Sequence, residues 1–101
     1  MHDAKRNPRQ GHGEYKIPGG KLVVVDLQVL DGRLNHVRLS GDFFLEPPEA
    51  LDAIDAALEG LPADIDAGRL AQAVSDALGA DVEMFGLTPE GIAVVVGRAL
   101  A

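Results

Sequence analysis

The residues best suited to chemistry lie in two short segments, 16–21 and 41–44. The first reads Lys16-Ile17-Pro18-Gly19-Gly20-Lys21, so two cations flank a glycine pair. Exposed backbone N–H groups in such a turn would suit a small anion or a contact with a partner protein. The alternative is a plain turn whose lysines are solvated at its two ends. Spacing alone favours the plain turn.

The end of this segment looks like a phosphate-binding P-loop, but the motif fails at two positions. The pattern G-x-x-x-x-G-K-[ST] needs Gly where this chain has Tyr15, and Ser or Thr where it has Leu22. A P-loop also leads from a strand into a helix, whereas a strand is predicted to follow here. The segment is therefore not a Walker motif.

The second segment, Gly41-Asp42-Phe43-Phe44, lies where a predicted strand gives way to a helix. The glycine suggests a bulge or a close approach of two backbones. The aspartate can accept hydrogen bonds from nearby N–H groups, and the two aromatic rings can act as core or interface anchors. The pattern favours a structural role over a chemical one.

No other set of side chains predicts catalysis or metal binding. The chain has no Cys, which excludes disulfides, thiolate metal sites and Cys nucleophiles. The histidines, His2, His12 and His36, are too scattered to predict a metal site. Ser40 and Ser75 lie outside any nucleophile elbow. We therefore predict no catalytic residue and no metal site in this chain.

Length and charge narrow the class of protein further. A chain of 101 residues fits one domain. Residues 1–21 carry five Lys or Arg against two Asp or Glu, whereas residues 22–101 carry four against fourteen. This acidic body argues against nucleic-acid binding. No apolar run approaches the roughly 20 residues that cross a bilayer, and the N-terminus lacks a secretory signal. We expect a cytoplasmic protein without a membrane span.

The elements that must position the two segments begin with a hairpin. Residues 1–13 are expected to be a mobile tail, and residues 14–101 a single domain. Residues 15–17 suggest a short strand. Alternation over 21–30 predicts a strand with Val23, Val25, Leu27 and Val29 on its apolar face. The Asp31-Gly32 pair predicts a tight turn.

The return strand, 34–43, is expected to add Val37, Leu39 and Phe43 to that apolar face. Its opposite face would carry Leu34, His36, Arg38 and Ser40. This antiparallel pairing would bring segments 16–21 and 41–44 together at one end of the sheet.

Three helices are predicted to follow. The first opens at Pro47-Pro48 and ends before Gly60, with Asp52, Asp55 and Glu59 on a solvated face. The second is capped by Asp66 and ends before Gly79. After an extended piece over 81–86, Thr88-Pro89 predicts a third helix, although residues 92–96 also suit a strand. The fold class is α+β, a small antiparallel sheet of two or three strands with three helices on one face.

These segments, taken together, resemble a known family. Residues 15–23, the Asp31-Gly32 turn, residues 40–44 and Pro48-Glu49 are similar to the C-terminal accessory domain of lipoate–protein ligases, which in some archaea and bacteria is a separate small subunit. Residues 86–92 look like the start of the family's last helix. The resemblance covers residues 14–100, and its most specific part is the pairing of K-x-P-x-G-K-L with G-D-F-F.

The resemblance implies a non-catalytic accessory subunit, inactive alone, in a heterodimer with a catalytic subunit of the ligase. Lipoate and ATP with Mg would bind that partner, and this chain would bind no cofactor alone. It would support activation of lipoate to lipoyl-adenylate, before transfer to lipoyl-domain acceptor proteins. The implied fold is similar to the sulfur-transfer and iron–sulfur scaffold superfamily. The acyl group, whether lipoate, octanoate or biotin, stays open.

Carried onto this sequence, the resemblance implies a set of contacts to the catalytic subunit or its adenylate loop. These candidates are Lys16, Pro18, Gly19, Gly20, Lys21, Asp42, Phe43 and Phe44. A lysine near the adenylate would neutralise phosphate charge. The alternative function is a small protein-binding or scaffold module unrelated to ligation, with the Phe pair as its contact patch.

Overall fold

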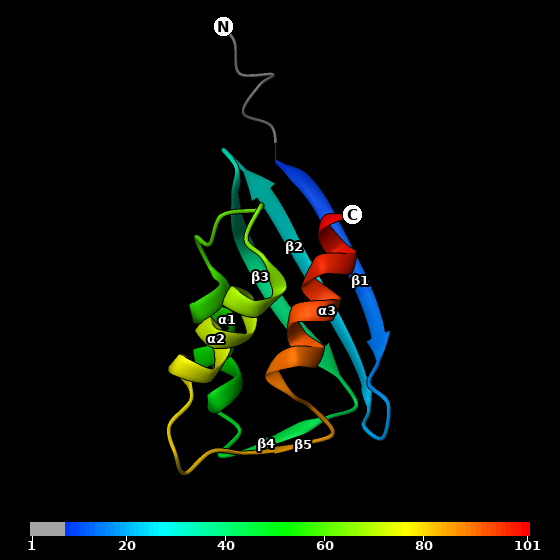
Figure 1. Cartoon of the computed structure of the whole chain (residues 1–101), viewed down its shortest axis with the longest axis vertical. Helices are drawn as coiled ribbons and strands as arrows, with labels where there is room; N and C mark the ends of the chain where they lie inside the picture. Colours follow the sequence, from blue (N-terminus) through cyan, green and yellow to red (C-terminus); the bar gives the residue numbers. More distant parts are fainter. Residues whose placement is uncertain (1–7) are drawn as a thin grey trace, which may run out of the picture.

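In the computed structural model, which describes residues 8–101, three helices cover one face of a three-stranded antiparallel sheet (Figure 1). This arrangement confirms the α+β prediction. The elements are β1 (Arg9–Lys16), β2 (Leu22–Leu30), β3 (Arg33–Gly41), β4 (Phe44–Glu46), α1 (Ala50–Leu58), α2 (Ala67–Ala77), β5 (Glu83–Phe85) and α3 (Pro89–Leu100). No helix within the described residues has the length and apolar character to cross a bilayer.

The strand order is β1-β2-β3, and β4 and β5 form a separate two-stranded sheet. As predicted, β2 turns Val23, Val25 and Leu27 toward the helices, where all three are buried. Asp31 and Gly32 adopt φ angles of 54° and 75°, the positive values that a tight hairpin turn requires. The central hairpin therefore follows directly from the sequence pattern.

A bulge changes the pattern of β3. Asp26 pairs with Arg38 and Gln28 with Asn35, so two residues of β3 oppose the single residue between them on β2. At the bulge His36 has a φ of 52°. The extra residue reverses the alternation of side chains. Leu34, which we had placed on the polar face, is therefore fully buried, and that prediction was wrong.

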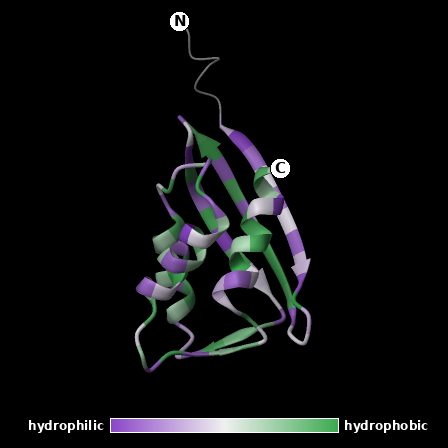
Figure 2. Cartoon of the chain, in the orientation of Figure 1, coloured by the Kyte–Doolittle hydropathy of each residue, from purple (hydrophilic) through white to green (hydrophobic). Residues whose placement is uncertain are grey.

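The start of the sheet also requires a correction. The predicted mobile tail covered residues 1–13, of which 1–7 lie outside the described residues, but residues 9–13 form the first part of β1. This strand carries few hydrophobic residues, as Figure 2 shows. It is held instead by close contact with α3. A Cβ atom at Gly11 would lie 2.5 Å from the carbonyl oxygen of Ala99, and one at Gly13 would lie 2.5 Å from that of Val95.

Helices α2 and α3 begin where their capping residues predict, whereas α1 begins at Ala50, after the predicted start at Pro47-Pro48, and its N-cap Glu49 makes no side-chain hydrogen bond. Asp66 accepts a hydrogen bond from the Arg69 N–H at 2.8 Å, and the Thr88 hydroxyl accepts one from the Gly91 N–H at 2.9 Å. Residues 92–96 are thus helical, as their capping sequence favoured. The hydrophobic core comprises Ile17, Val23, Val25, Leu27, Leu34, Val37, Leu39, Leu45, Ala50, Ile54, Leu58, Leu70, Val74, Leu87, Ile92, Ala93, Val95, Val96 and Ala99.

The outer edge of β3 is closed by carboxylates from α1 and its C-terminal end. Asp55 accepts a hydrogen bond from the Leu39 N–H at 3.1 Å, and Glu59 accepts one from the Val37 N–H at 2.6 Å. Burial raises the pKa of Asp55. We had predicted a solvated face for these carboxylates. Asp52 and Glu59 are exposed, but Asp55 is half-buried, and the sequence did not show that Asp55 and Glu59 bond the edge of β3 in place of a neighbouring strand.

The contact between β1 and α3 predicts opposite effects for two glycine substitutions. Gly13→Ala places a methyl group against helix backbone, so the free energy of unfolding should fall by about 1–3 kcal/mol. A Cβ atom at Gly97, which lies on α3 itself, would have no neighbouring atom within 4 Å. Gly97→Ala should therefore raise the free energy of unfolding by up to about 1 kcal/mol through helix propensity. Urea denaturation of both variants measures the difference, and equal stabilities would contradict this packing.

Candidate functional site

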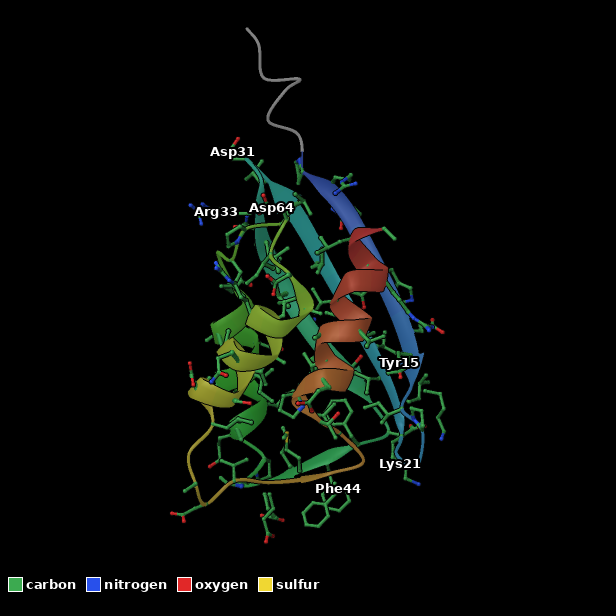
Figure 3. All side chains as sticks on the ribbon, viewed as in Figure 1. Tyr15, Lys21, Asp31, Arg33, Phe44 and Asp64 are labelled. Carbon is green, nitrogen blue, oxygen red and sulfur yellow. The ribbon has the colours of Figure 1, made fainter. Side chains whose placement is uncertain are left out.

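The two segments singled out in the sequence lie together at one end of the sheet, as expected. Val23 pairs with Gly41 across β2 and β3, and the Asp42 N–H donates to the Leu22 carbonyl at 3.0 Å. Figure 3 shows Lys21 and Phe44 at this end and the hairpin residue Asp31 at the other. We call residues 16–21, 41–46 and 83–86 the sheet-end surface.

The third part of this surface, residues 83–86, was missed in the sequence. The Lys21 N–H donates to the Gly86 carbonyl at 3.0 Å, and a Cβ atom at Gly86 would lie 2.3 Å from Cγ of Lys21. Gly86 also has a φ of 80°, which favours glycine. A glycine at the end of an extended piece was visible, but nothing in the sequence connected it to residues 16–21.

The two lysines of the first segment differ in their surroundings. The Lys16 ammonium donates to the Gly20 carbonyl at 3.0 Å and lies 3.5 Å from the Ile17 carbonyl, so Lys16 folds back over its own turn. Lys21 is exposed, and no described residue pairs with its ammonium group. Lys21 is therefore the cation that this turn presents to a partner.

The turn between these lysines uses most of its own N–H groups. The Gly20 N–H donates to the Ile17 carbonyl at 2.8 Å, and the Lys21 N–H is held by Gly86. Pro18 has no N–H, and Gly19 takes a φ of 73° at the exposed tip. The turn thus presents a shaped backbone surface on which Lys21 is the cation that no described residue pairs, not a row of donors for an anion.

An aromatic stack dominates the other side of the surface. Phe44 and Phe85 face each other across β4 and β5, with ring centroids 4.7 Å apart and an interplanar angle of 17°. Phe44 is 59% exposed and Phe85 40% exposed. Phe43 is half-buried and packs against the core, so the adjacent phenylalanines have different roles.

A hollow of about 250 Å³ adjoins the stack. Its lining is mainly apolar: Phe43, Phe44, Leu45, Glu46, Pro48 and Leu51. An exposed aromatic pair beside an apolar hollow is typical of a surface that receives a side chain from another protein. Asp42 is exposed nearby and adds a negative charge to the rim.

The described residues contain no group of three or more His, Asp and Glu side chains that could hold a metal ion. His36 lies in the β3 bulge, and His2 lies outside the described residues. The His12 ring bridges two carboxylates on the face of the sheet away from the helices, at 2.8 Å from Glu14 and 2.7 Å from Asp26. The hydrogen bond to Glu14, followed by that to Asp26, raises the pKa of His12.

The His12 bridge predicts a pH dependence. Its folded-state pKa lies above the ordinary value of 6.5, so the bridge stabilises the fold below that value and loses this contribution as the pH rises through the raised pKa. An NMR titration should show the His12 ring titrating above its ordinary pKa. Glu14→Gln should lower that pKa. A wild-type ring that titrates at or below 6.5 would contradict the bridge.

Comparison with known proteins connects this fold to one system. No family model and no curated protein matches the sequence. The structure matches a chain from an archaeal lipoylation system of Thermoplasma acidophilum, comprising a bi-partite lipoate protein ligase and its E2 lipoyl domain. The TM-score is 0.66 at 20% identity, over 90% of this chain and 96% of that one. This chain therefore has the fold of a component of a lipoylation system.

Proposed function

We propose that this chain is a non-catalytic accessory subunit of a lipoate–protein ligase. It would support ATP-dependent activation of lipoate to lipoyl-adenylate on a separate catalytic subunit. One observation carries the proposal. This chain shares its fold with a component of a bi-partite ligase system, over nearly the full length of both chains. The residues that resemble the accessory domain, 16–21 and 41–44, meet on one surface of that fold.

The chemistry of the surface supports an accessory role. It combines an aromatic stack, an apolar hollow and Lys21, an exposed cation that no described residue pairs, but has no nucleophile paired with a base. Such a surface is suited to docking. Lipoate and ATP with Mg would bind the catalytic subunit in the cytoplasm, and lipoyl-domain acceptor proteins would meet the complex.

Within this complex Lys21 has the better position for contact with the adenylate. Lys16 is bonded to its own turn, whereas the ammonium of Lys21 extends from a backbone that Gly86 holds in place. A fixed cation near the α-phosphate would stabilise the negative charge that develops as pyrophosphate leaves. Lys16 would act indirectly, by keeping the turn in shape.

Truncation of the aromatic stack tests docking. Phe44→Ala should weaken binding to the catalytic subunit at least about tenfold, because exposed aromatic anchors carry much of an interface's energy. Val94→Ala is the control, since Val94 is also an exposed large apolar residue but lies on α3, outside the sheet-end surface. Calorimetry with the purified catalytic subunit measures both. Equal affinities would exclude the stack from the interface.

Removal of the Lys21 charge tests the contact with the adenylate. Lys21→Ala should slow lipoate-dependent pyrophosphate release by the saturated complex about tenfold, a loss near 1.4 kcal/mol of transition-state stabilisation. Lys21→Arg should retain most activity, and Arg69→Ala, which removes an exposed cation on α2, should retain all of it. Unchanged adenylation by Lys21→Ala would remove Lys21 from the chemistry but leave docking intact.

The alternative, a scaffold module unrelated to ligation, has a different outcome. Affinity capture from the native host should recover a ligase-like catalytic lobe if the proposal holds. Recovery of unrelated proteins, with no activation of the catalytic subunit on mixing, would favour the scaffold function.

A further inference from the structure

Within residues 8–101, most outward backbone groups of β1 have no partner. In an antiparallel strand the N–H and C=O of one residue point to the same side. The Ile17 N–H donates to the Lys21 carbonyl, so odd-numbered residues of β1 point toward β2. Gln10, His12 and Glu14 therefore point outward. Among the described residues only one hydrogen bond reaches this edge, from the Arg98 guanidinium to the Glu14 carbonyl at 3.1 Å.

The opposite edge of the sheet is closed. Besides Asp55 and Glu59, the segment after α1 pairs with the start of β3, where the Leu34 N–H donates to the Leu61 carbonyl at 2.9 Å. Figure 1 shows α1 and its connection beside β3, and no element beyond β1. Because an unprotected edge readily pairs with another strand, the difference marks β1 as the edge open to a partner.

The charges near β1 indicate the kind of segment that would pair there. Arg9 and Lys16 lie at the two ends of the strand, and Arg98 lies over the Tyr15 ring at 4.8 Å. These three cations outnumber the carboxylate of Glu14 on the same strand, which His12 bridges to Asp26. We call Arg9, Lys16 and Arg98 the basic strip, on a chain of net charge −7. A backbone N–H of an added strand would replace Arg98 as the donor to the Glu14 carbonyl. The Arg98 guanidinium would then be available to a carboxylate of that strand.

The strip is also continuous with the sheet-end surface. Lys16 ends β1 and opens the turn at residues 16–21, so a strand laid along β1 leads directly to Lys21. A second copy of this chain fits the edge less well. Pairing of two β1 edges would place the basic strips of both copies side by side, where their like charges repel.

We propose that the β1 edge accepts an extended, acidic segment of the catalytic subunit as a fourth strand. The inference rests on the proposed function and adds a second contact to its interface. Main-chain hydrogen bonds would supply affinity, and the basic strip would select an acidic sequence. Pairing of this kind would also fix the orientation of Lys21 relative to the partner.

Hydrogen exchange tests the pairing amide by amide. In the isolated chain the N–H groups of Gln10, His12 and Glu14 should exchange rapidly, whereas those of Gly11 and Gly13 should be protected by β2. In the complex the three outward amides should slow at least about tenfold. Ultracentrifugation of the isolated chain at the same concentration should show a monomer.

Proline substitutions test the same hydrogen bonds by affinity. Gln10→Pro and His12→Pro each remove one outward N–H at positions where an edge strand tolerates proline. Each should bind the catalytic subunit about tenfold more weakly than its matched control, Gln10→Ala or His12→Ala. Melting curves show whether each proline variant is folded to the same extent as its alanine control. If a proline variant is not folded, hydrogen exchange of the outward amides in the wild-type complex decides whether the strand pairs.

The outcomes separate the two proposals. A complex that forms while the three outward amides stay unprotected would overturn the strand pairing and leave the accessory function standing. Absence of any complex would overturn both. A dimer of the isolated chain with protected outward amides would show that a second copy occupies the edge, which also overturns the pairing.

Discussion

The close approach of α3 to β1 is the contact on which the rest of the structure depends. Gly11 and Gly13 let the helix backbone reach the strand backbone, at positions where any side chain would collide with carbonyl oxygens of α3. This contact makes an ordered strand from a segment with few hydrophobic side chains. It thereby fixes Lys16 and the following turn at the end of the sheet, and it leaves the outer edge of β1 exposed beside the helix.

Hydrophobic alternation and capping chemistry are local signals, so β2, its hairpin turn, α2 and α3 could be predicted from sequence. The errors arise where backbone contacts decide the structure. Gly11 and Gly13 look like tail residues because they bury no side chain. Leu34 was misplaced because one extra residue at His36 reverses the alternation. The edge bonds of Asp55 and Glu59 were missed because their partners are backbone N–H groups of a distant strand.

In the candidate site, too, the local arrangement could be predicted from the sequence and the long-range contacts could not. Segments 16–21 and 41–44 could be placed together because a hairpin joins them. Phe85 and Gly86 could not, because they follow two intervening helices. Phe85 pairs with β4 through a three-residue strand, and Gly86 bonds to Lys21. Their contribution is substantial. Phe85 completes the aromatic stack, and Gly86 holds the backbone of Lys21. The sequence thus indicated which cations flank the turn, but only the structure distinguishes Lys21 from Lys16.

A ligase divided between two chains, as proposed, must orient its accessory subunit without a covalent linker. An aromatic stack beside a hollow can anchor one point, but a single apolar contact leaves rotation about that point. Strand pairing along β1 adds direction, because hydrogen bonds in a ladder are spaced and oriented along the strand. The turn at residues 16–21 lies between the two contacts, because Lys16 ends β1 and the Lys21 N–H bonds Gly86, the neighbour of Phe85. A cation placed between them would be held more firmly than one at the margin of either surface, as the proposed stabilisation of charge on the α-phosphate requires.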